Sequence, residues 1–389
     1  MLGILPLLAA CAGVAPNTGR ATPVPSKAVL VFADWEAPGT FDPRPPTTGA
    51  RLRDDTLVYG RLWIPDPAGR LLPDLAAEVP RPDGDMLTVN LRPGLRWSDG
   101  SPLTAADVVR SYALQGVGAV ALSATRLRVQ SGQATSVASV FVAPPQADGR
   151  VASGPFRLVA ADSGELRFTR NPHYHGRQPY LAEIDELVSS SHDAMEEAAQ
   201  AGEVDFLPHL GPADLAAHFG PLRTVVTISE RNEVLVPAGI DARLLAALSA
   251  ATDRQALVTQ AFGGAGKPLG LPPQVDLARH FLAGRTPTIA LQTVCDDPLR
   301  ASEAAALAAQ WSQIGARVTT SCAAISQLTS TPPTPRLALY SVLAGQTPAD
   351  AISLLQRPAL RAVSTALHGF EANDTVGTDL WDVSEWWLQ

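Results

Sequence analysis

The chain has 389 residues, which is too long for a single compact core and predicts two or three domains. Hydrophobic residues make up 46% of it and charged residues 17%, a globular composition with enough apolar side chains for large cores. The formal net charge of −8 argues against nucleic-acid binding, which requires a basic surface, so we expect no nucleic-acid partner.

The N-terminus has the form of a bacterial lipoprotein signal. Residues 1–10 are apolar, and the sequence LAAC at residues 8–11 matches a lipobox, in which the thiol of Cys11 is acylated. Residues 12–27 are expected to form a flexible tether, and the apolar run is too short to span a bilayer, so attachment through lipid is expected. The alternative is a buried N-terminal helix with an incidental cysteine. No Lys or Arg precedes the run, as a secretory signal normally requires, which leaves the true start codon open.

The first half of the chain alternates strand patterns with irregular segments. Residues 28–35 are typical of a strand, and residues 37–56 are proline-rich and expected to be irregular. Residues 86–97 predict a strand, a break and a second strand, whereas the pattern weakens over 117–150. Residues 151–171 predict a hairpin with its turn at 162–164.

The second half mixes helices and strands. Residues 192–207 predict a short helix, a stop at glycine and a strand, and residues 241–264 predict a pair of helices. The spacing of Thr252 and Gln255 predicts a capping box for the second of these helices. Residues 286–295, 298–315 and 316–322 predict strand, amphipathic helix and strand, which implies a parallel pair with a right-handed crossover.

Residues 91–114, LRPGLRWSDGSPLTAADVVRSYAL, combine a turn signal with a capped helix. Asp99-Gly100 is typical of a turn. Thr104 and Asp107 have capping-box spacing, which predicts a helix that begins near Ala105.

These segments, in this order, resemble the extracytoplasmic solute-binding proteins of peptide/nickel ABC importers, the dipeptide- and oligopeptide-binding family. The residues that carry the resemblance are Leu91-Arg92-Pro93-Gly94 with Trp97, Asp99-Gly100, Ser101-Pro102 and Ala106-Asp107-Val108; Val58-Tyr59-Gly60-Arg61-Leu62 with residues 69–76; Ser153-Gly154-Pro155-Phe156 with residues 170–174; residues 201–205; and Leu380-Trp381-Asp382-Val383 with Glu385-Trp386-Trp387. Five motifs in order, together with a lipobox, indicate the family more strongly than any one of them.

The resemblance implies an α/β, two-lobed periplasmic-binding-protein-like fold (type II, Venus-flytrap) with mixed sheets and a reduced extra domain. The expected division is signal and lipobox cysteine 1–11, tether 12–27, discontinuous lobe I 28–50 plus 151–240 plus 363–389, reduced inserted domain 51–150, and lobe II 241–362. The chain is shorter than family members between Leu114 and Gly154 and between Leu355 and His368, which puts the completeness of the binding cavity in doubt.

The resemblance also points to ligand contacts. Peptide binders of the family carry an aspartate after an aromatic-rich strand, where it pairs with the peptide's α-amino group. The matching strand here contains Tyr340, and the acidic position falls at Gly345, beside Gln346. The family's clamp is therefore expected to be absent unless another acid replaces it; Asp350 lies five residues further on. Either the solute has no free α-amino group, or a different carboxylate pairs with that group.

Trp35 and Glu36 follow the first strand, at the end where α/β clefts open. Glu36 is a candidate for contact with a cation or a backbone amide, and the alternative is a surface carboxylate. Trp35 and Tyr340 are each expected to be either cavity wall or core.

The sequence gives little support for metal binding or catalysis. His173 and His175 have the spacing of a metal pair, but a surface turn is the favoured interpretation, and we expect no metal and no cofactor. Nucleophile-elbow, P-loop and zinc-protease motifs do not occur, and the glycines before Lys267 follow a helix and not a strand, so we expect no enzyme. A secreted hydrolase is the least favoured class.

Cys295 and Cys322 end the two strands of the predicted βαβ unit. Parallel neighbours lie about 4.8 Å apart, within the range that a disulfide tolerates, so we expect the pair to be bonded. The alternative is two buried free thiols.

The function expected from the sequence is a substrate-binding lipoprotein of an ABC transporter. It would capture a small solute, peptide or peptide-like, outside the cytoplasmic membrane and deliver it to a permease as a monomer. The alternative is a degenerate family member that acts as a sensory or interaction module with little transport ligand.

Overall fold

The computed structural model describes residues 28–34, 41–42, 49–79, 84–130, 140–162, 164–188, 192–210, 219–294, 298–323, 328, 335–343, 347–374 and 379–389. Its elements are β1 (Val29–Asp34), α1 (Gly49–Val58), β2 (Trp63–Pro65), β3 (Leu71–Pro73), β4 (Met86–Asn90), α2 (Ala105–Leu114), β5 (Ala119–Ser123), β6 (Arg126–Gln130), β7 (Phe156–Asp162), β8 (Glu165–Arg170), β9 (Glu183–Val188), α4 (His192–Gln200), β10 (Phe206–Leu207), β11 (Leu222–Ala238), α5 (Ala242–Ala251), α6 (Arg254–Phe262), β12 (Lys267–Pro268), α7 (Val275–Leu282), β13 (Thr288–Val294), α8 (Pro298–Ser312), β14 (Arg317–Ala323), β15 (Arg336–Leu343), β16 (Ile352–Ser364), β17 (Leu367–His368), η3 (Asp379–Glu385) and β18 (Trp387–Leu388).

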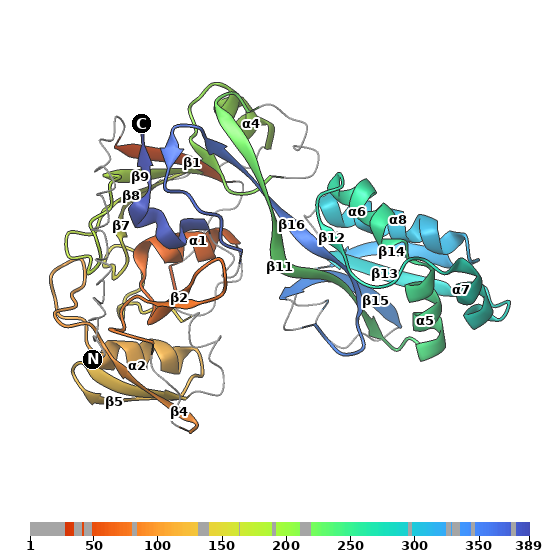
Figure 1. The fold of residues 1–389 in the computed structure, drawn as a ribbon, viewed down its shortest axis with the longest axis horizontal. Coiled ribbons are helices and arrows are strands. Elements are labelled where there is room, and N and C mark those ends of the chain that lie inside the picture. Colours follow the sequence, from red (N-terminus) through yellow and green to blue (C-terminus); the bar gives the residue numbers. More distant parts are fainter. Residues whose placement is uncertain are drawn as a thin grey trace, which may run out of the picture.

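Two lobes are joined by a pair of long strands (Figure 1). In the described part of the chain, an 11-stranded sheet runs in the order β14-β13-β15-β11-β16-β10-β1-β9-β8-β7, with β12 paired to β16. The first lobe holds β1 and β7–β10, the second holds β12–β15 with α5–α8, and the antiparallel strands β11 and β16 cross from one lobe to the other. The sheet contains both parallel and antiparallel pairs, so the predicted two-lobed α/β fold with mixed sheets is confirmed.

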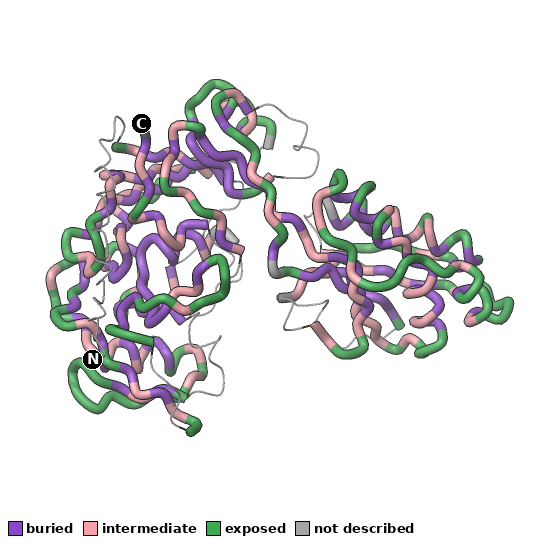
Figure 2. Tube along the Cα trace, in the orientation of Figure 1, coloured by how far each residue is buried: buried purple, intermediate pink, exposed green. Residues whose placement is uncertain are grey.

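Each lobe has its own hydrophobic core. In the first lobe, one cluster surrounds Phe32, Phe206 and Trp386, and a smaller cluster packs α4 against the opposite face of the sheet. In the second lobe, residues of α5–α8 pack around Trp311. A further cluster around Tyr112 joins α2 to the three-stranded sheet β4-β6-β5. Figure 2 shows the buried residues gathered on either side of the crossing strands.

Several local predictions are confirmed. Strands β7 and β8 form the predicted hairpin, and β13 and β14 form the predicted parallel pair, with Thr293 opposite Cys322. Helix α2 begins at Ala105, where the Asp107 carboxylate accepts hydrogen bonds from the backbone N–H of Thr104 at 2.8 Å and from its hydroxyl at 3.0 Å.

The structure differs from the sequence-based expectations at several places. Residues 86–97 form only one strand, β4, and the residues after it make two isolated bridges, Leu91 with Ala76 and Arg96 with Pro102. The weakly patterned segment after residue 117 forms the hairpin β5–β6. The cap of α6 is Asp253, whose carboxylate accepts from the Ala256 N–H at 2.9 Å.

Helix α1 lies within the segment that was expected to be irregular. Its Arg53, Asp54 and Asp55 are buried. Because charged residues form part of its buried face, the helix has no continuous apolar stripe that would identify it in the sequence. Arg53 is paired with Asp34 of β1, a contact that only the tertiary structure supplies, whereas Asp55 is paired with Arg51 of the same helix.

Candidate functional site

The carboxyl ends of the parallel strands in the first lobe face the second lobe. Strand β1 is parallel to β9 and β10, so these three strands end at the same edge. Strand β10 is antiparallel to β16, with Leu207 opposite Ala362, and β16 enters from the second lobe. The edge at which Asp34 ends β1 therefore points toward the second lobe.

The parallel strands of the second lobe point back in the opposite direction. Strands β13, β14 and β15 are mutually parallel, and β15 is antiparallel to β11, with Leu343 opposite Arg231 and Arg336 opposite Ala238. Because β11 arrives from the first lobe, the carboxyl end of β15 faces that lobe. Ligands in open α/β sheets bind outside the carboxyl ends of strands. We call the two opposed strand edges, with the crossing between them, the interlobe face.

On the first lobe, buried charges lie at this face. Arg53 of α1 forms an ion pair with Asp34. Its Nη1 atom lies 3.2 Å from Nδ1 of His209. The imidazole of His209 is 3.8 Å from the other Asp34 oxygen, and its side chain is 45% exposed. The group therefore presents one accessible imidazole above a buried ion pair.

Two further acids, Asp54 and Glu186, interact with Arg53. Burial raises the pKa of Glu186 well above its ordinary value, the nearby Asp54 carboxylate raises it further, and Arg53 opposes both effects. Burial likewise lowers the pKa of Arg53, against the opposing effect of Asp54 and Glu186. A proton on Glu186 reduces the negative charge buried around Arg53.

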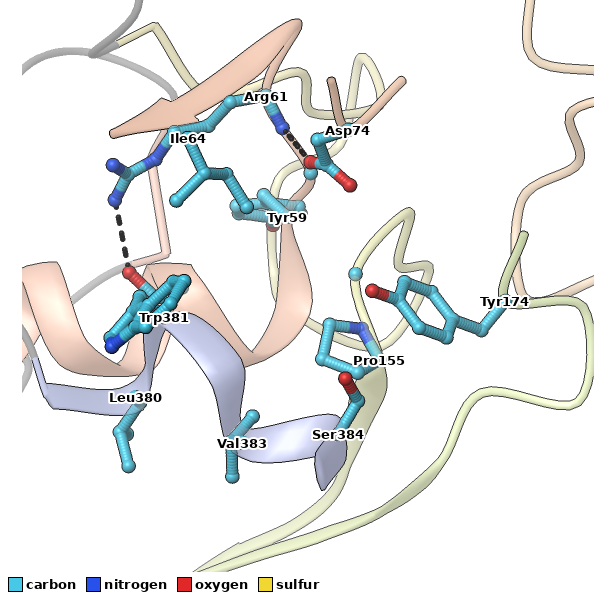
Figure 3. Close-up of a pocket in the computed structure, with 13 residues that line it drawn as sticks. Tyr59, Arg61, Ile64, Asp74, Pro155, Tyr174, Leu380, Trp381, Val383 and Ser384 are labelled. Atoms are coloured by element: carbon cyan, nitrogen blue, oxygen red, sulfur yellow. Dashed lines mark hydrogen bonds between the residues drawn. The ribbon is translucent and has the colours of Figure 1, made fainter. Parts of the chain in front are cut away.

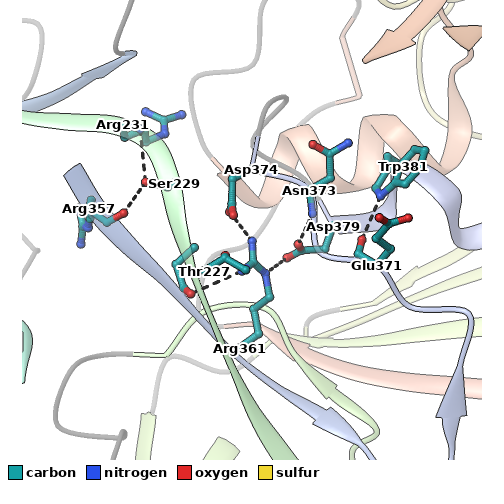
Figure 4. Close-up of polar contacts among 11 residues, drawn as sticks. Thr227, Ser229, Arg231, Arg357, Arg361, Glu371, Asn373, Asp374, Asp379 and Trp381 are labelled. Carbon is teal, nitrogen blue, oxygen red and sulfur yellow. Dashed lines mark hydrogen bonds and ion pairs between the residues drawn. The ribbon is translucent and has the colours of Figure 1, made fainter. Parts of the chain in front are cut away.

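At the crossing, Arg361 of β16 ties three segments together (Figure 4). Its guanidinium donates to Asp379 and Asp374, both at 2.5 Å, and to the Thr227 hydroxyl of β11 at 2.7 Å. Burial lowers the pKa of Arg361, but the two carboxylates outweigh burial and leave it raised. The arginine thus fixes both crossing strands to the C-terminal segment.

On the second lobe, Glu233 of β11 is fully buried at the interlobe face. It pairs with Arg300 of α8 and accepts a hydrogen bond from the Ser341 hydroxyl at 2.6 Å. Arg300 also pairs with Glu303 at 3.1 Å and donates to Ser341 at 2.6 Å. Burial lowers the pKa of Arg300 to about 10, so it remains a cation at neutral pH.

A cavity of about 620 Å³ lies beside the start of β16 in the second lobe. Its polar lining includes Asn232, Ser249, Arg254 and Asp350. Arg254 is committed to structure, because it donates to backbone carbonyls that include that of Ser353 at 2.9 Å. Asn232 and Asp350 therefore supply the polar groups available to a ligand, and the volume falls within the range of small-molecule sites.

A second cavity is too small for a solute. It measures about 20 Å³ and lies between the first lobe and the β2–β3 segment, lined by Arg61, Asp74, Tyr174 and Trp381 among others (Figure 3). Such a volume holds one water molecule. The Asp74 carboxylate is engaged here, since it accepts from the Arg61 N–H at 2.7 Å and pairs with His175 at 2.9 Å.

The structure describes two of the residues singled out from the sequence as candidate sites. Tyr340 lies half-buried on β15, where burial raises its pKa and the Asp350 carboxylate raises it further. Cys322 lies on β14. The remaining candidates fall outside the described residues: Cys11, Trp35, Glu36, Cys295, Gly345 and Gln346.

The sequence did not reveal the charged residues that line the interlobe face. Arg53, Glu233, Arg300 and Arg361 carry no motif, and their partners are distant in sequence. The strand-end position next to Trp35 was a usable signal for Asp34, because the prediction of a cleft there follows from strand direction alone.

The family model of the bacterial extracellular solute-binding proteins, family 5 (middle), matches residues 70–117 and 143–281. Over these residues, just under half of the chain, the sequence is similar to the family 5 solute-binding proteins. In the described residues no helix is long and apolar enough to cross a membrane, and no cluster of three or more metal-ligating side chains occurs.

Two curated relatives illustrate the sequence similarity. Protein XP55 from Streptomyces lividans is 29% identical over 272 residues, which cover 59% of this chain and 50% of that protein. Oligopeptide-binding protein AppA from Bacillus subtilis is 24% identical over 330 residues, or 70% of this chain and 60% of AppA. The chain thus spans about half the length of the curated relatives it matches.

Solved structures share the fold. AppA from Bacillus subtilis, in complex with a nonapeptide, has a TM-score of 0.75 at 18% identity and covers 94% of this chain and 100% of its own. CtaP from Listeria monocytogenes reaches 0.78 at 17% identity, covering 93% and 99%. NikA from Brucella suis, in complex with Fe(III)-EDTA, reaches 0.75 at 15%, covering 93% and 100%.

Proposed function

We propose that this protein is a solute receptor that closes its two lobes on a small ligand and delivers it to an ABC permease. The observation that carries the proposal is the opposition of the parallel-strand carboxyl ends across the β11–β16 crossing. Closure around a solute favours the transport-competent arrangement only if the solute contacts both lobes, as a ligand at this face does. AppA is named as an oligopeptide-binding protein and CtaP as a substrate-binding protein of an ABC transporter, which supports a receptor that performs no covalent step.

The proposed solute is a peptide or a peptide-like molecule. AppA is an oligopeptide-binding protein by name and by its nonapeptide complex, which supports this class by similarity. Asp350 lines the 620 Å³ cavity, and its carboxylate raises the pKa of Tyr340. It is our candidate for the acid that replaces the missing carboxylate at Gly345, with Gln346, Trp35 and Glu36 as further candidate contacts.

We further propose that the receptor works outside the cytoplasmic membrane as a monomer, anchored by lipid at Cys11. The lipobox sequence supports the anchor, and the family description, extracellular, supports the location. The proposed division is lobe I (28–50, 151–240 and 363–389), inserted domain (51–150) and lobe II (241–362). The separate core clusters support three units but not these bounds, because Leu57 and Phe141 belong to the first-lobe cluster and Leu235 to the second-lobe cluster.

A second candidate function is an interaction or sensory module with little transport ligand. The features that favour it are the shortened segments between Leu114 and Gly154 and between Leu355 and His368, and the glycine at the family's acidic position, Gly345. The two functions differ in whether the purified protein holds or binds a solute.

Native mass spectrometry of the freshly purified full chain tests the proposal. A receptor is expected to carry an adduct or to gain one from a mixed tripeptide library, with a change in the fluorescence of its seven tryptophans. No adduct, together with no thermal shift across a peptide, sugar and metal library, would count against a transport receptor and support the sensory module.

A further inference from the structure

Helix α5 presents two apolar stripes, one to the core of the second lobe and one to the 620 Å³ cavity. The core stripe is buried and consists of Leu244, Ala247, Leu248 and Ala251. The second stripe lines the cavity at spacings of three and four residues, with Ala242, Leu245, Ala246 and Ser249. The apolar part of the lining also includes Leu269, Ala351 and Ile352. An apolar group of a ligand is therefore stabilised here, because it displaces water from the apolar surface of α5 and of the start of β16.

Asn232 of β11 brings a buried amide with incomplete hydrogen bonding to this cavity. The residue is 8% exposed and pairs with Val342, one position before the carboxyl end of β15. Its Nδ2 atom donates to the Thr347 hydroxyl at 3.3 Å, whereas its Oδ1 atom is buried and accepts no hydrogen bond from the described residues. A buried carbonyl oxygen without a donor costs free energy. A ligand that donates an N–H or O–H to Oδ1 removes this cost.

The polar groups that the cavity offers to a ligand are hydrogen-bond acceptors. Asp350 lines the cavity beside Asn232 and is exposed, so its carboxylate is accessible. The cation in the lining, Arg254, is directed at the protein. It donates to the carbonyl of Ser353 at 2.9 Å, and to the carbonyl and hydroxyl of Ser249 at 3.2 and 3.0 Å. The cavity therefore favours a ligand group that donates hydrogen bonds, such as an ammonium, beside an apolar group.

We propose that this cavity makes the receptor selective for solutes whose first residue carries a bulky apolar side chain. This inference rests on the proposed function and adds to it the identity of that residue. The side chain lies against Leu245 and Ala246, and the N–H groups of the same residue donate to Asn232 Oδ1 and the Asp350 carboxylate. The lining residues belong to the second lobe and to the parts of β11 and β16 inside it. The first residue is therefore recognised by the second lobe alone, and the rest of the solute extends toward the interlobe face.

The test compares two tripeptides of equal composition, Phe-Ala-Ala and Ala-Ala-Phe, on the full chain by isothermal titration calorimetry. We expect Phe-Ala-Ala to bind at least about tenfold more tightly, because only its apolar side chain reaches the cavity. Ala246→Phe fills the cavity and should abolish the preference, whereas the control Ala305→Phe, at an exposed position of α8, should keep it. Asn232→Leu removes the amide and should weaken the binding of Phe-Ala-Ala about tenfold without lowering the Tm of the free protein.

The outcomes separate this selectivity from the receptor function. Equal affinity of the native chain for both tripeptides, or a preference retained in Ala246→Phe, overturns the selectivity and leaves solute binding standing. An unchanged affinity in Asn232→Leu overturns the role of the amide. If the native chain binds neither tripeptide, 2-phenylethylamine is the second probe. Binding of this amine that Ala246→Phe abolishes supports the cavity as a site without a peptide receptor, whereas no binding overturns the selectivity together with the peptide proposal.

Discussion

Arg361 is the residue whose removal should cost most at the crossing. Arg361→Gln leaves the carboxylates of Asp374 and Asp379 buried without their cation, so we expect a loss of about 3–5 kcal/mol in the free energy of unfolding. Urea denaturation of the native chain and the variant measures this loss in the free energy of unfolding. The control Arg167→Gln removes an arginine that is 44% exposed, in surface pairs, and should cost less than about 1 kcal/mol. Equal losses in the two variants would show that Arg361 does not stabilise the crossing.

Asp382 should make stability depend on pH. Burial raises its pKa to about 8, although a hydrogen bond donated by Trp386 at 2.8 Å opposes the shift. Between about pH 4 and 8 the folded state holds a proton that the unfolded state releases. The free energy of unfolding therefore falls as pH rises through this window.

Asp382→Asn removes this dependence because an amide does not titrate, and it keeps the hydrogen bond because the amide oxygen still accepts from Trp386. At pH 8 the variant should exceed the native chain by at least about 1.4 kcal/mol, the equivalent of one pKa unit, and at pH 4 the two should agree. Thermal unfolding across this range measures the difference, with Asp85→Asn in an exposed turn as the control. A gain that does not change with pH would contradict the assignment.

At the scale of elements, the βαβ unit supports a disulfide between Cys295 and Cys322. Strand β13 ends at Val294, and Thr293 lies opposite Cys322 on the parallel neighbour β14. We propose that the bond closes the β13–α8–β14 unit and contributes roughly 3–4 kcal/mol by restricting the unfolded chain. Mass after alkylation, with and without prior reduction, should differ by two labels; equal masses would exclude the bond.

The sequence predicted elements that depend on neighbouring residues better than elements that depend on pairing between distant segments. The turn at Asp99-Gly100 and the capping box at Thr104 depend on neighbours within a few residues, and both form: Ser101 N–H donates to Asp99 at 2.9 Å. The crossing strands β11 and β16 depend on pairing between residues such as Leu222 and Ser364. No short window of the sequence contains that information.

At the scale of the whole molecule, the two lobes should approach each other when a solute binds. Small-angle scattering of the full chain should show a radius of gyration that falls, on addition of the tripeptide library, toward the roughly 21 Å of a compact chain of this length. The control is the same series with buffer alone. An unchanged radius, with solute bound by native mass spectrometry, would show that binding does not close the lobes.

The sequence by itself predicted the resemblance to family 5 solute-binding proteins, the α/β class and most local elements. The local elements could be predicted because turns, caps and amphipathic stripes are set by short-range sterics and hydrogen bonding. Only the tertiary structure decided the interlobe face. Arg361 meets Thr227 across 134 positions of sequence, and Glu233 meets Ser341 across 108. A buried charge is stable only where a distant segment delivers its partner, so neither residue has a local pattern that identifies it.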